Sequence, residues 1–236
     1  TALVFDHPTP RALASAVAGV VSAVGGEVSA VAGGEGAVGG EWVPLAPTQR
    51  RLWTAASMAE AAPLYAVPVV VPVPDGVSVE QAADALRAVI ARHQALRLAY
   101  GDTGSGPRQR VVEGWSPDVE ILAAESLDAD VLTGLLHLPP ANSAGTPPVR
   151  ALVVSVLTDT GERPLAVGIL AHHISIDGES AAMIAADLTA AMMSTPVGAS
   201  TGDFLGAAAE LDSRERTEHA DLLEFWEQAL DGYADD

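Results

Sequence analysis

The sequence contains no cysteine, and this absence removes several kinds of chemistry before any pattern is considered. Disulfides, thiolate metal sites, iron–sulfur clusters and cysteine nucleophiles are all excluded within this chain. Lysine is missing too, because all 12 basic residues are arginines. The chain therefore cannot supply the lysine of a phosphate-binding loop, of a Schiff base or of a kinase-type site.

Positive charge and long apolar runs are scarce as well. The 12 basic residues stand against 31 acidic ones, for a formal net charge of −19. A field of that sign repels phosphate backbones and anionic lipid headgroups, so we expect no nucleic-acid partner and no membrane partner. No apolar run approaches the ~20 residues that span a bilayer, and the N-terminal residues lack the layout of a signal peptide. We therefore expect a cytoplasmic location.

The sequence does contain a large apolar fraction, 49% of its 236 residues, with 18% charged residues. That composition predicts a globular protein with one large or two small domains. Thr9 and Pro10 are typical of a helix start and predict a short helix that ends near residue 21. Gly pairs recur between residues 22 and 41, which predicts a flexible linker without stable helix or sheet before organised sequence begins at Trp42.

Periodicity predicts secondary structure along the organised part of the chain. Ser78 and Gln81 fit a capping box, and apolar residues recur at helical spacing after them. Val-rich sequence interrupted by prolines predicts an edge strand, and two apolar runs joined by a turn predict a central hairpin. The expected elements are a helix from Thr48, an edge strand at 66–73, a helix at 79–95, extended runs at 108–113 and 118–123, a helix at 128–137, hairpin strands at 149–157 and 165–173, and helices at 178–193 and 216–230. In the last helix we expect an apolar stripe to be buried: Leu222, Leu223, Phe225, Trp226 and Leu230.

One short segment concentrates residues that carry chemistry. Residues 172–178 read His-His-Ile-Ser-Ile-Asp-Gly, and they follow an apolar strand and precede a helix. Side chains at such a position commonly meet ligands. Because adjacent strand residues point to opposite faces, His172 and His173 are expected to have different roles, and at most one of them to be catalytic.

Simpler interpretations of this segment stay open. A histidine at the end of a strand is often structural, and Asp177 is suited to capping the next helix. A metal site would need His172, His173 and Asp177 to converge, but neighbours on opposite faces do not reach one ion without a bend. We therefore expect no metal. His93 lies among apolar helix positions and is interpreted as a hydrogen-bonded core histidine.

Arg97 would lie on the apolar face of the helix at 79–95, with Leu86 and Ile90, if that helix continued. A buried guanidinium without a carboxylate costs several kcal/mol, and an internal carboxylate has the same difficulty. We therefore hypothesise an ion pair between Arg97 and Asp177 that braces the turn at His173. The alternative is a surface arginine placed after the helix has ended.

Three separated stretches resemble the motifs of one family, the condensation domains of nonribosomal peptide synthetases and of hybrid polyketide/peptide synthetases. Residues 172–178 match its double-histidine signature. Residues 47–53 (Pro-Thr-Gln-Arg-Arg-Leu-Trp) are similar to its first helix, and residues 92–97 (Arg-His-Gln-Ala-Leu-Arg) to its second motif. The resemblance implies an α/β protein of the α+β two-layer sandwich type, one lobe of a chloramphenicol-acetyltransferase-like fold. Residues 42–200 would be the N-terminal lobe, and 201–236 an acidic crossing segment toward a second lobe.

The resemblance also implies partners and a reaction. Residues 1–21 resemble the C-terminal helix of a carrier domain, in wording closest to polyketide synthase carriers. Upstream and downstream acyl or peptidyl carriers would deliver substrates on phosphopantetheine arms, and the lobe itself would bind no cofactor directly. The implied reaction is attack of an acceptor amine, or less often a hydroxyl, on a donor thioester, which gives an amide or an ester.

The resemblance assigns a role to each residue of the signature. His173 would contact the nucleophile, and would take up its proton or orient it. His172 would be structural. Asp177 would brace the loop with Arg97, and Gly178 would let the chain turn and bring backbone amides near the thioester carbonyl.

Alternatives to this function remain. An epimerisation-type relative shares the signature, and a non-catalytic lobe that docks carriers or serves as a scaffold would retain it for the fold alone. A free acyltransferase with a diffusible acceptor is disfavoured by the adjoining carrier-like helix, because tethering raises effective concentration. The heterocyclising branch is disfavoured because its paired aspartates are replaced here by His172 and His173.

Overall fold

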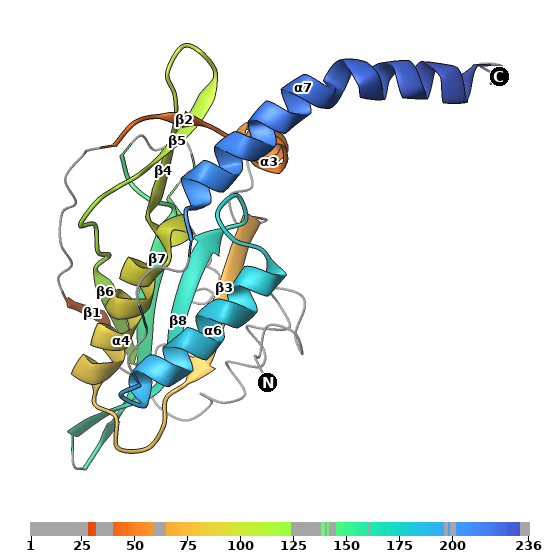
Figure 1. Ribbon diagram of the computed structural model, residues 1–236. Helices are drawn as coiled ribbons and strands as arrows, with labels where there is room; N and C mark the ends of the chain where they lie inside the picture. The colour runs from red at the N-terminus through yellow and green to blue at the C-terminus, as the bar shows by residue number, and fades with distance from the viewer. Residues whose placement is uncertain are drawn as a thin grey trace.

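The computed structural model describes residues 28–31, 40–58, 65–123, 138–139, 141, 145–159, 161–195, 198 and 202–231. Its helices are α3 (Pro47–Met58), α4 (Val79–Arg92), the 3₁₀ helix η2 (Gln94–Arg97), α6 (Gly178–Met192) and α7 (Phe204–Leu230). Its strands are β1 (Val28–Val31), β2 (Val43–Pro44), β3 (Ala66–Pro72), β4 (Leu98–Asp102), β5 (Pro107–Val111), β6 (Val119–Ala123), β7 (Val149–Thr158) and β8 (Gly161–His172). Figure 1 shows how these elements are arranged.

The larger sheet has the strand order β1-β6-β7-β8-β3. Strands β7 and β8 form the antiparallel hairpin that the sequence predicted, and β3 is the predicted edge strand. Pro68 and Pro72 are tolerated in β3 because an edge strand has a neighbour on one side only. Strands β6 and β7 pair in parallel, and the other pairs are antiparallel.

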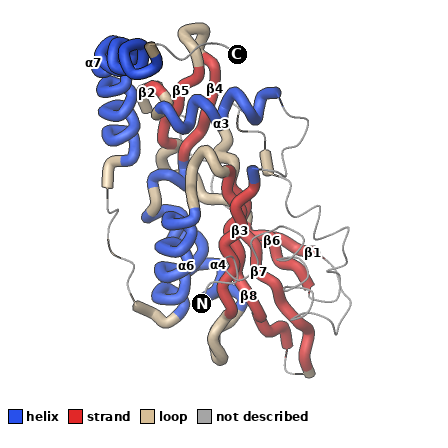
Figure 2. Tube along the Cα trace, turned by 90° about the vertical axis from the view of Figure 1, so that its right-hand side faces the viewer, coloured by secondary structure: helices blue, strands red, loops and turns tan. Residues whose placement is uncertain are grey.

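Helices α4 and α6 lie side by side on one face of this sheet (Figures 1 and 2). The predicted capping box starts α4: Ser78 Oγ accepts from Gln81 N at 3.2 Å, and Gln81 Oε1 accepts from Ser78 N at 2.8 Å. The apolar faces of the helices and the sheet form one core, in which Leu86, Ile90 and Ile169 are fully buried. This arrangement confirms the expected α+β two-layer architecture.

A smaller sheet, with the order β2-β5-β4, lies beyond one end of the larger sheet, and α3 crosses it (Figure 2). Helix α3 begins at Pro47, one residue before the expected Thr48, because proline needs no hydrogen-bond partner for an amide in the first turn. A second core joins this sheet to the turn after β8, and its buried members are Leu45, Leu98, Tyr100, Val111, Ala141 and Ile174. The turn that carries the histidines therefore rests on this smaller core.

Helix α7 packs against the body of the protein through its first half, and its second half extends away from it (Figure 1). Arg50 of α3 holds the first half through ion pairs with Asp212 and Glu215. The expectation that an apolar stripe in the second half is buried is wrong within this chain, because no described segment packs there. About half of each of these side chains is exposed: 49% for Leu222, 50% for Leu223, 58% for Phe225, 55% for Trp226 and 53% for Leu230. None of the described helices is both long enough and apolar enough to cross a membrane.

Strand β1 corrects the expectation for the Gly-rich stretch at 22–41. Residues 28–31 of that stretch form a strand that pairs antiparallel with β6 at the edge of the larger sheet. The open edge of β6 supplies hydrogen-bond partners to an extended backbone even where the flanking sequence is rich in glycine. The carrier-like helix expected within residues 1–21 and the helix expected at 128–137 lie outside the described residues.

Candidate functional site

His172 is the last residue of β8, and its ring is buried, with 3% of the residue exposed. The ring stacks on Tyr65, with centroids 5.5 Å apart, and Nδ1 accepts a hydrogen bond from Ile174 N at 3.1 Å. Burial, and secondarily the charge of His173, lowers the pKa of His172 from 6.5 to about 4. His172 is therefore a neutral imidazole at pH 7, with its proton on Nε2 because Nδ1 accepts.

His173 begins the turn that follows β8, and its side chain is exposed. Its backbone amide donates to Tyr65 O at 2.7 Å, whereas its ring has no hydrogen-bond partner among the described residues. The two histidines face different surroundings, as the alternation of strand side chains predicted, since one ring is buried and the other faces solvent. The difference in their roles stays a prediction. Nowhere in the described part of the chain do three His, Asp or Glu side chains cluster as metal ligands.

Asp177 is the N-cap of α6, one of the two interpretations that the sequence left open. Its Oδ1 accepts from Ser180 N at 2.8 Å and from Ser180 Oγ at 2.7 Å. The bond from the Ser180 backbone amide is the main reason that the pKa of Asp177 lies below its ordinary value. Gly178 is the first residue of α6 and does not have a positive φ, so this position does not need glycine for its backbone conformation.

The hypothesised ion pair between Arg97 and Asp177 is wrong. Helix α4 ends at Arg92, and Arg97 lies on η2, so its side chain does not follow the helical face from which the pair was inferred. Arg97 Nη1 instead lies 3.3 Å from Glu113 Oε2, with 13% of the Arg97 side chain exposed. Asp177 is exposed and is satisfied by Ser180.

A buried polar network beneath the turn was not predicted. Gln49 of α3 donates through Nε2 to Ile174 O at 3.1 Å, and Tyr100 Oη lies 2.8 Å from Ser175 Oγ. Gln49 and Gln109 also face each other as a reciprocal amide pair. The sequence signal for Gln49 was its place in the segment 47–53, but its partners are distant in the chain and no local pattern identifies them.

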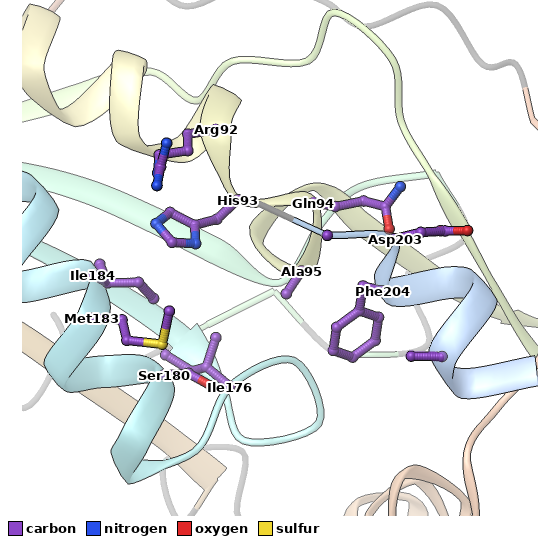
Figure 3. Close-up of a pocket in the computed structure, with 12 residues that line it drawn as sticks. Arg92, His93, Gln94, Ala95, Ile176, Ser180, Met183, Ile184, Asp203 and Phe204 are labelled. Carbon is purple, nitrogen blue, oxygen red and sulfur yellow. The ribbon is translucent and has the colours of Figure 1, made fainter. Parts of the chain in front are cut away.

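A pocket of about 300 Å³ lies beside the signature segment, between the end of α4, the first half of α6 and the start of α7 (Figure 3). Ile176 and Ser180, which flank the Asp177 cap, line one side of it. His93 lines the opposite side, and its Nε2 lies 2.7 Å from Asp187 Oδ2, which also accepts from Arg92 Nε at 2.8 Å. The hydrogen bond expected of His93 is thereby confirmed, but its place in the core is not, because His93 follows the last residue of α4 and lines a pocket. The lining residues are Arg92, His93, Gln94, Ala95, Ile176, Ser180, Met183, Ile184, Gly202, Asp203, Phe204 and Ala207.

Comparison with known proteins agrees with this geometry. The family model of the condensation domain matches residues 40–236, which is more than half of the chain. The chain is also similar to isonitrile lipopeptide synthase of Mycobacterium tuberculosis, with 32% identity over 161 residues. That similarity covers 66% of this chain and 6% of the relative, so the chain corresponds to a small part of the synthase.

Solved structures share the fold at lower identity. The X-domain in the complex of the X-domain and OxyB from teicoplanin biosynthesis superposes with a TM-score of 0.63 and 23% identity, over 84% of this chain and 46% of that one. The starter condensation domain of rhizomide synthetase RzmA gives a TM-score of 0.58 and 17% identity, over 80% of this chain and 48% of that one. The chain therefore spans about half the length of these structures, and the expected fold class is confirmed.

Proposed function

The chain belongs to the condensation domain family, and from this premise we propose that it contributes His173 to an active site for amide formation between carrier-bound substrates. The donor is an acyl or peptidyl thioester and the acceptor is an amine, or a hydroxyl where an ester forms. One observation carries the proposal. In the family's signature segment the ring of the second histidine is exposed and has no hydrogen-bond partner among the described residues, whereas the first ring is buried and hydrogen-bonded.

The reaction requires a group that accepts the proton of the nucleophile and passes it to the leaving group. The acceptor nitrogen attacks the thioester carbonyl carbon, the C–N bond forms, the C–S bond breaks, and the carrier thiol leaves. The nitrogen loses one proton, which the His173 imidazole accepts and returns to the leaving sulfur. The exposed ring of His173 suits this role, because the substrate can reach it and no described side chain holds its nitrogens.

The other residues of the signature act through the backbone. We assign to His172 the support of the turn from beneath, because its Nδ1 holds Ile174 N. Asp177 fixes the first turn of α6 by capping it. Gly178 leaves the space above that turn free of a side chain. Arg97 has no part in this scheme, because its partner is Glu113 and not Asp177.

The proposal includes partners for this lobe. Carrier domains would deliver both substrates on phosphopantetheine arms, with residues 1–21 as the end of the upstream carrier. Residues 22–41 would connect it to the lobe at 42–200, and β1 within them belongs to the larger sheet of that lobe. Residues 201–236 would lead to a second lobe that supplies the other wall of the site. Two observations support that lobe: the chain spans about half of the solved structures it matches, and the apolar second half of α7 is exposed.

A single-turnover assay in the full-length protein tests the proposal. Donor and acceptor are loaded on their carriers, and the amide product is measured by mass spectrometry. We expect His173→Ala to lower the rate by about 100-fold or more, in the range of general acid–base catalysis. His219→Ala, which removes an exposed histidine of α7, is the matched control and should leave the rate unchanged. A His173→Ala rate equal to that of the unaltered protein would reject the proposal.

A second candidate function is a docking lobe without chemistry. Its support is the likeness to the X-domain, which was solved as a complex with OxyB. In that case neither the unaltered protein nor the His173→Ala variant would form amide, and both would still bind loaded carriers. An epimerisation-type activity would instead appear as inversion of the donor's α-carbon without amide formation.

A further inference from the structure

We propose that Gln49 is a positioning residue for His173, which it fixes from beneath through the carbonyl group of Ile174. The inference rests on the proposed function, because it assigns Gln49 to the same reaction. Gln49 belongs to α3, far from the signature in the sequence, and 4% of it is exposed. Its Nε2 donates to Ile174 O at 3.1 Å, and Ile174 directly follows His173.

The orientation of the Gln49 amide is determined on both sides. Its Oε1 accepts from Ala46 N at 2.9 Å, which commits Nε2 to the side of the turn. Gln109 of β5, which is fully buried, forms two hydrogen bonds with the Gln49 amide, each 2.9 Å long. Gln109 is held in turn by Pro44 O, to which its Nε2 donates at 3.2 Å. Every polar atom of Gln49 therefore has a partner, and the amide cannot rotate without losing several bonds.

The turn is held at successive backbone groups around His173. The His173 amide donates to Tyr65 O at 2.7 Å, and the Ile174 amide donates to His172 Nδ1 at 3.1 Å. Gln49 hydrogen-bonds to the carbonyl of the same Ile174, and Tyr100 hydrogen-bonds to the side chain of Ser175. The backbone on both sides of His173 is thus fixed, and its imidazole can move only by rotation about its own side-chain bonds.

The Ile174 carbonyl depends on Gln49 for its direction. Among the described contacts Gln49 is the side chain that donates to it, and Ile174 is buried, with 2% exposed. Without that donor, a buried carbonyl group is left unsatisfied and the peptide can turn to find another partner. A displacement of about 1 Å in a reacting group is enough to cost on the order of 100-fold in rate. Gln49 lies under the turn, so its loss should change kcat and leave KM nearly the same.

The test compares two buried glutamines of one network in the full-length protein. Gln49→Met keeps the length of the side chain and removes the donor to the turn. Gln109→Met removes the same amide pair but leaves Gln49 hydrogen-bonded to Ala46 N and to Ile174 O, so the contact with the turn is kept. We expect Gln49→Met to lower the single-turnover rate by about 10- to 100-fold with KM within about twofold, and Gln109→Met to lower it by less than about threefold. Equal rate losses in the two variants would show a general loss of packing and overturn the proposal.

Gln49→Glu provides a readout that a merely structural role would not change. A protonated carboxyl group can donate to Ile174 O in place of Nε2, and an ionised one cannot. Burial favours the protonated form, so the rate relative to the unaltered protein should be close to 1 at acid pH and should fall as pH rises. This variant also replaces Gln49→Met if the latter does not fold. A pH-independent ratio near 1 would overturn the proposal.

The outcome for Gln49 is separable from the outcome for the proposed function. If the unaltered protein forms amide and His173→Ala does not, the proposed function stands, and the Gln49 variants alone decide the present inference. If His173→Ala forms amide at the full rate, there is no His173 chemistry to position, and both statements fail together.

Discussion

His172 and His173 are neighbours in the sequence, yet the fold gives them opposite surroundings. His172 is enclosed by Tyr65 on one side and by the backbone of the turn on the other, and it is used as a hydrogen-bond acceptor. His173 is exposed and hydrogen-bonds to Tyr65 only through its main chain. The first ring therefore contributes contacts that hold the turn, and the second is accessible from solvent.

The buried state of His172 predicts a dependence of stability on pH. Its pKa is about 4 in the folded protein, below its ordinary value of 6.5, so the unfolded chain takes up the proton first as pH falls. This contribution is complete above about pH 6.5 and is lost as pH falls toward 4, by at most about 3 kcal/mol. His172→Asn keeps an acceptor for Ile174 N but does not titrate. Urea unfolding between pH 7 and pH 4 should therefore show a smaller loss of stability for the variant than for the unaltered protein, and equal losses would contradict this account.

At the scale of residues, the sequence predicted the surroundings of side chains where short-range geometry decides them. The alternation of strand side chains separated His172 from His173, and the position of Asp177 before a helix suggested a cap. The partner of Arg97 could not be predicted in this way. The prediction assumed that the helix continued to Arg97, but α4 ends at Arg92. The contact between Gln49 and Ile174 joins segments that come together only in the tertiary fold.

At the scale of elements, Asp177 determines where α6 begins, because it caps the first turn of that helix. Replacing an N-cap carboxylate with alanine should lower the free energy of unfolding by about 1 kcal/mol, and Asp177→Asn, which retains a capping oxygen, should lower it by less. If Arg97 and Asp177 are not partners, the effects of Arg97→Ala and Asp177→Ala should add within about 0.5 kcal/mol in the double variant. A coupling energy well above that value, measured by urea unfolding, would restore the discarded ion pair.

Elements with complete local signals were predictable. The capping box fixed the start of α4, and the two apolar runs around a turn gave the hairpin of β7 and β8. Strand β1 was missed because its formation depends on the free edge of β6, which lies far away in the sequence. The apolar residues of α7 recur with the period of a buried helix face, but none of the described residues covers them. The period alone therefore predicted burial where these side chains are exposed.

At the scale of the whole molecule, α7 presents apolar side chains that no described segment covers. Its first half is held by Arg50, and its second half presents Phe225 and Trp226 to solvent. Burying large apolar side chains contributes ~2 kcal/mol each, so a second lobe that covers them would gain substantial stability from this helix. In the proposed two-lobe protein, this burial would stabilise the contact between the lobes along α7.

Hydrogen exchange on the full-length protein tests that picture. If the second lobe covers the distal half of α7, the amides of residues 222–230 should exchange as slowly as those of α4, which is buried against the sheet. Phe225→Ser together with Trp226→Ser should accelerate exchange there and leave exchange in α4 near the sheet unchanged. Fast exchange of residues 222–230 in the unaltered protein would mean that this half of α7 remains free in the complete protein.

The rate of amide formation in a single turnover, measured side by side for His173→Ala and His172→Asn in the full-length protein, tests whether His173 contacts the nucleophile. We predict that His173→Ala lowers the rate by about 100-fold or more at an unchanged melting temperature, whereas His172→Asn lowers the melting temperature and retains most of the rate of the folded fraction. The reverse pattern, with catalysis lost at His172 and retained at His173, would contradict the account.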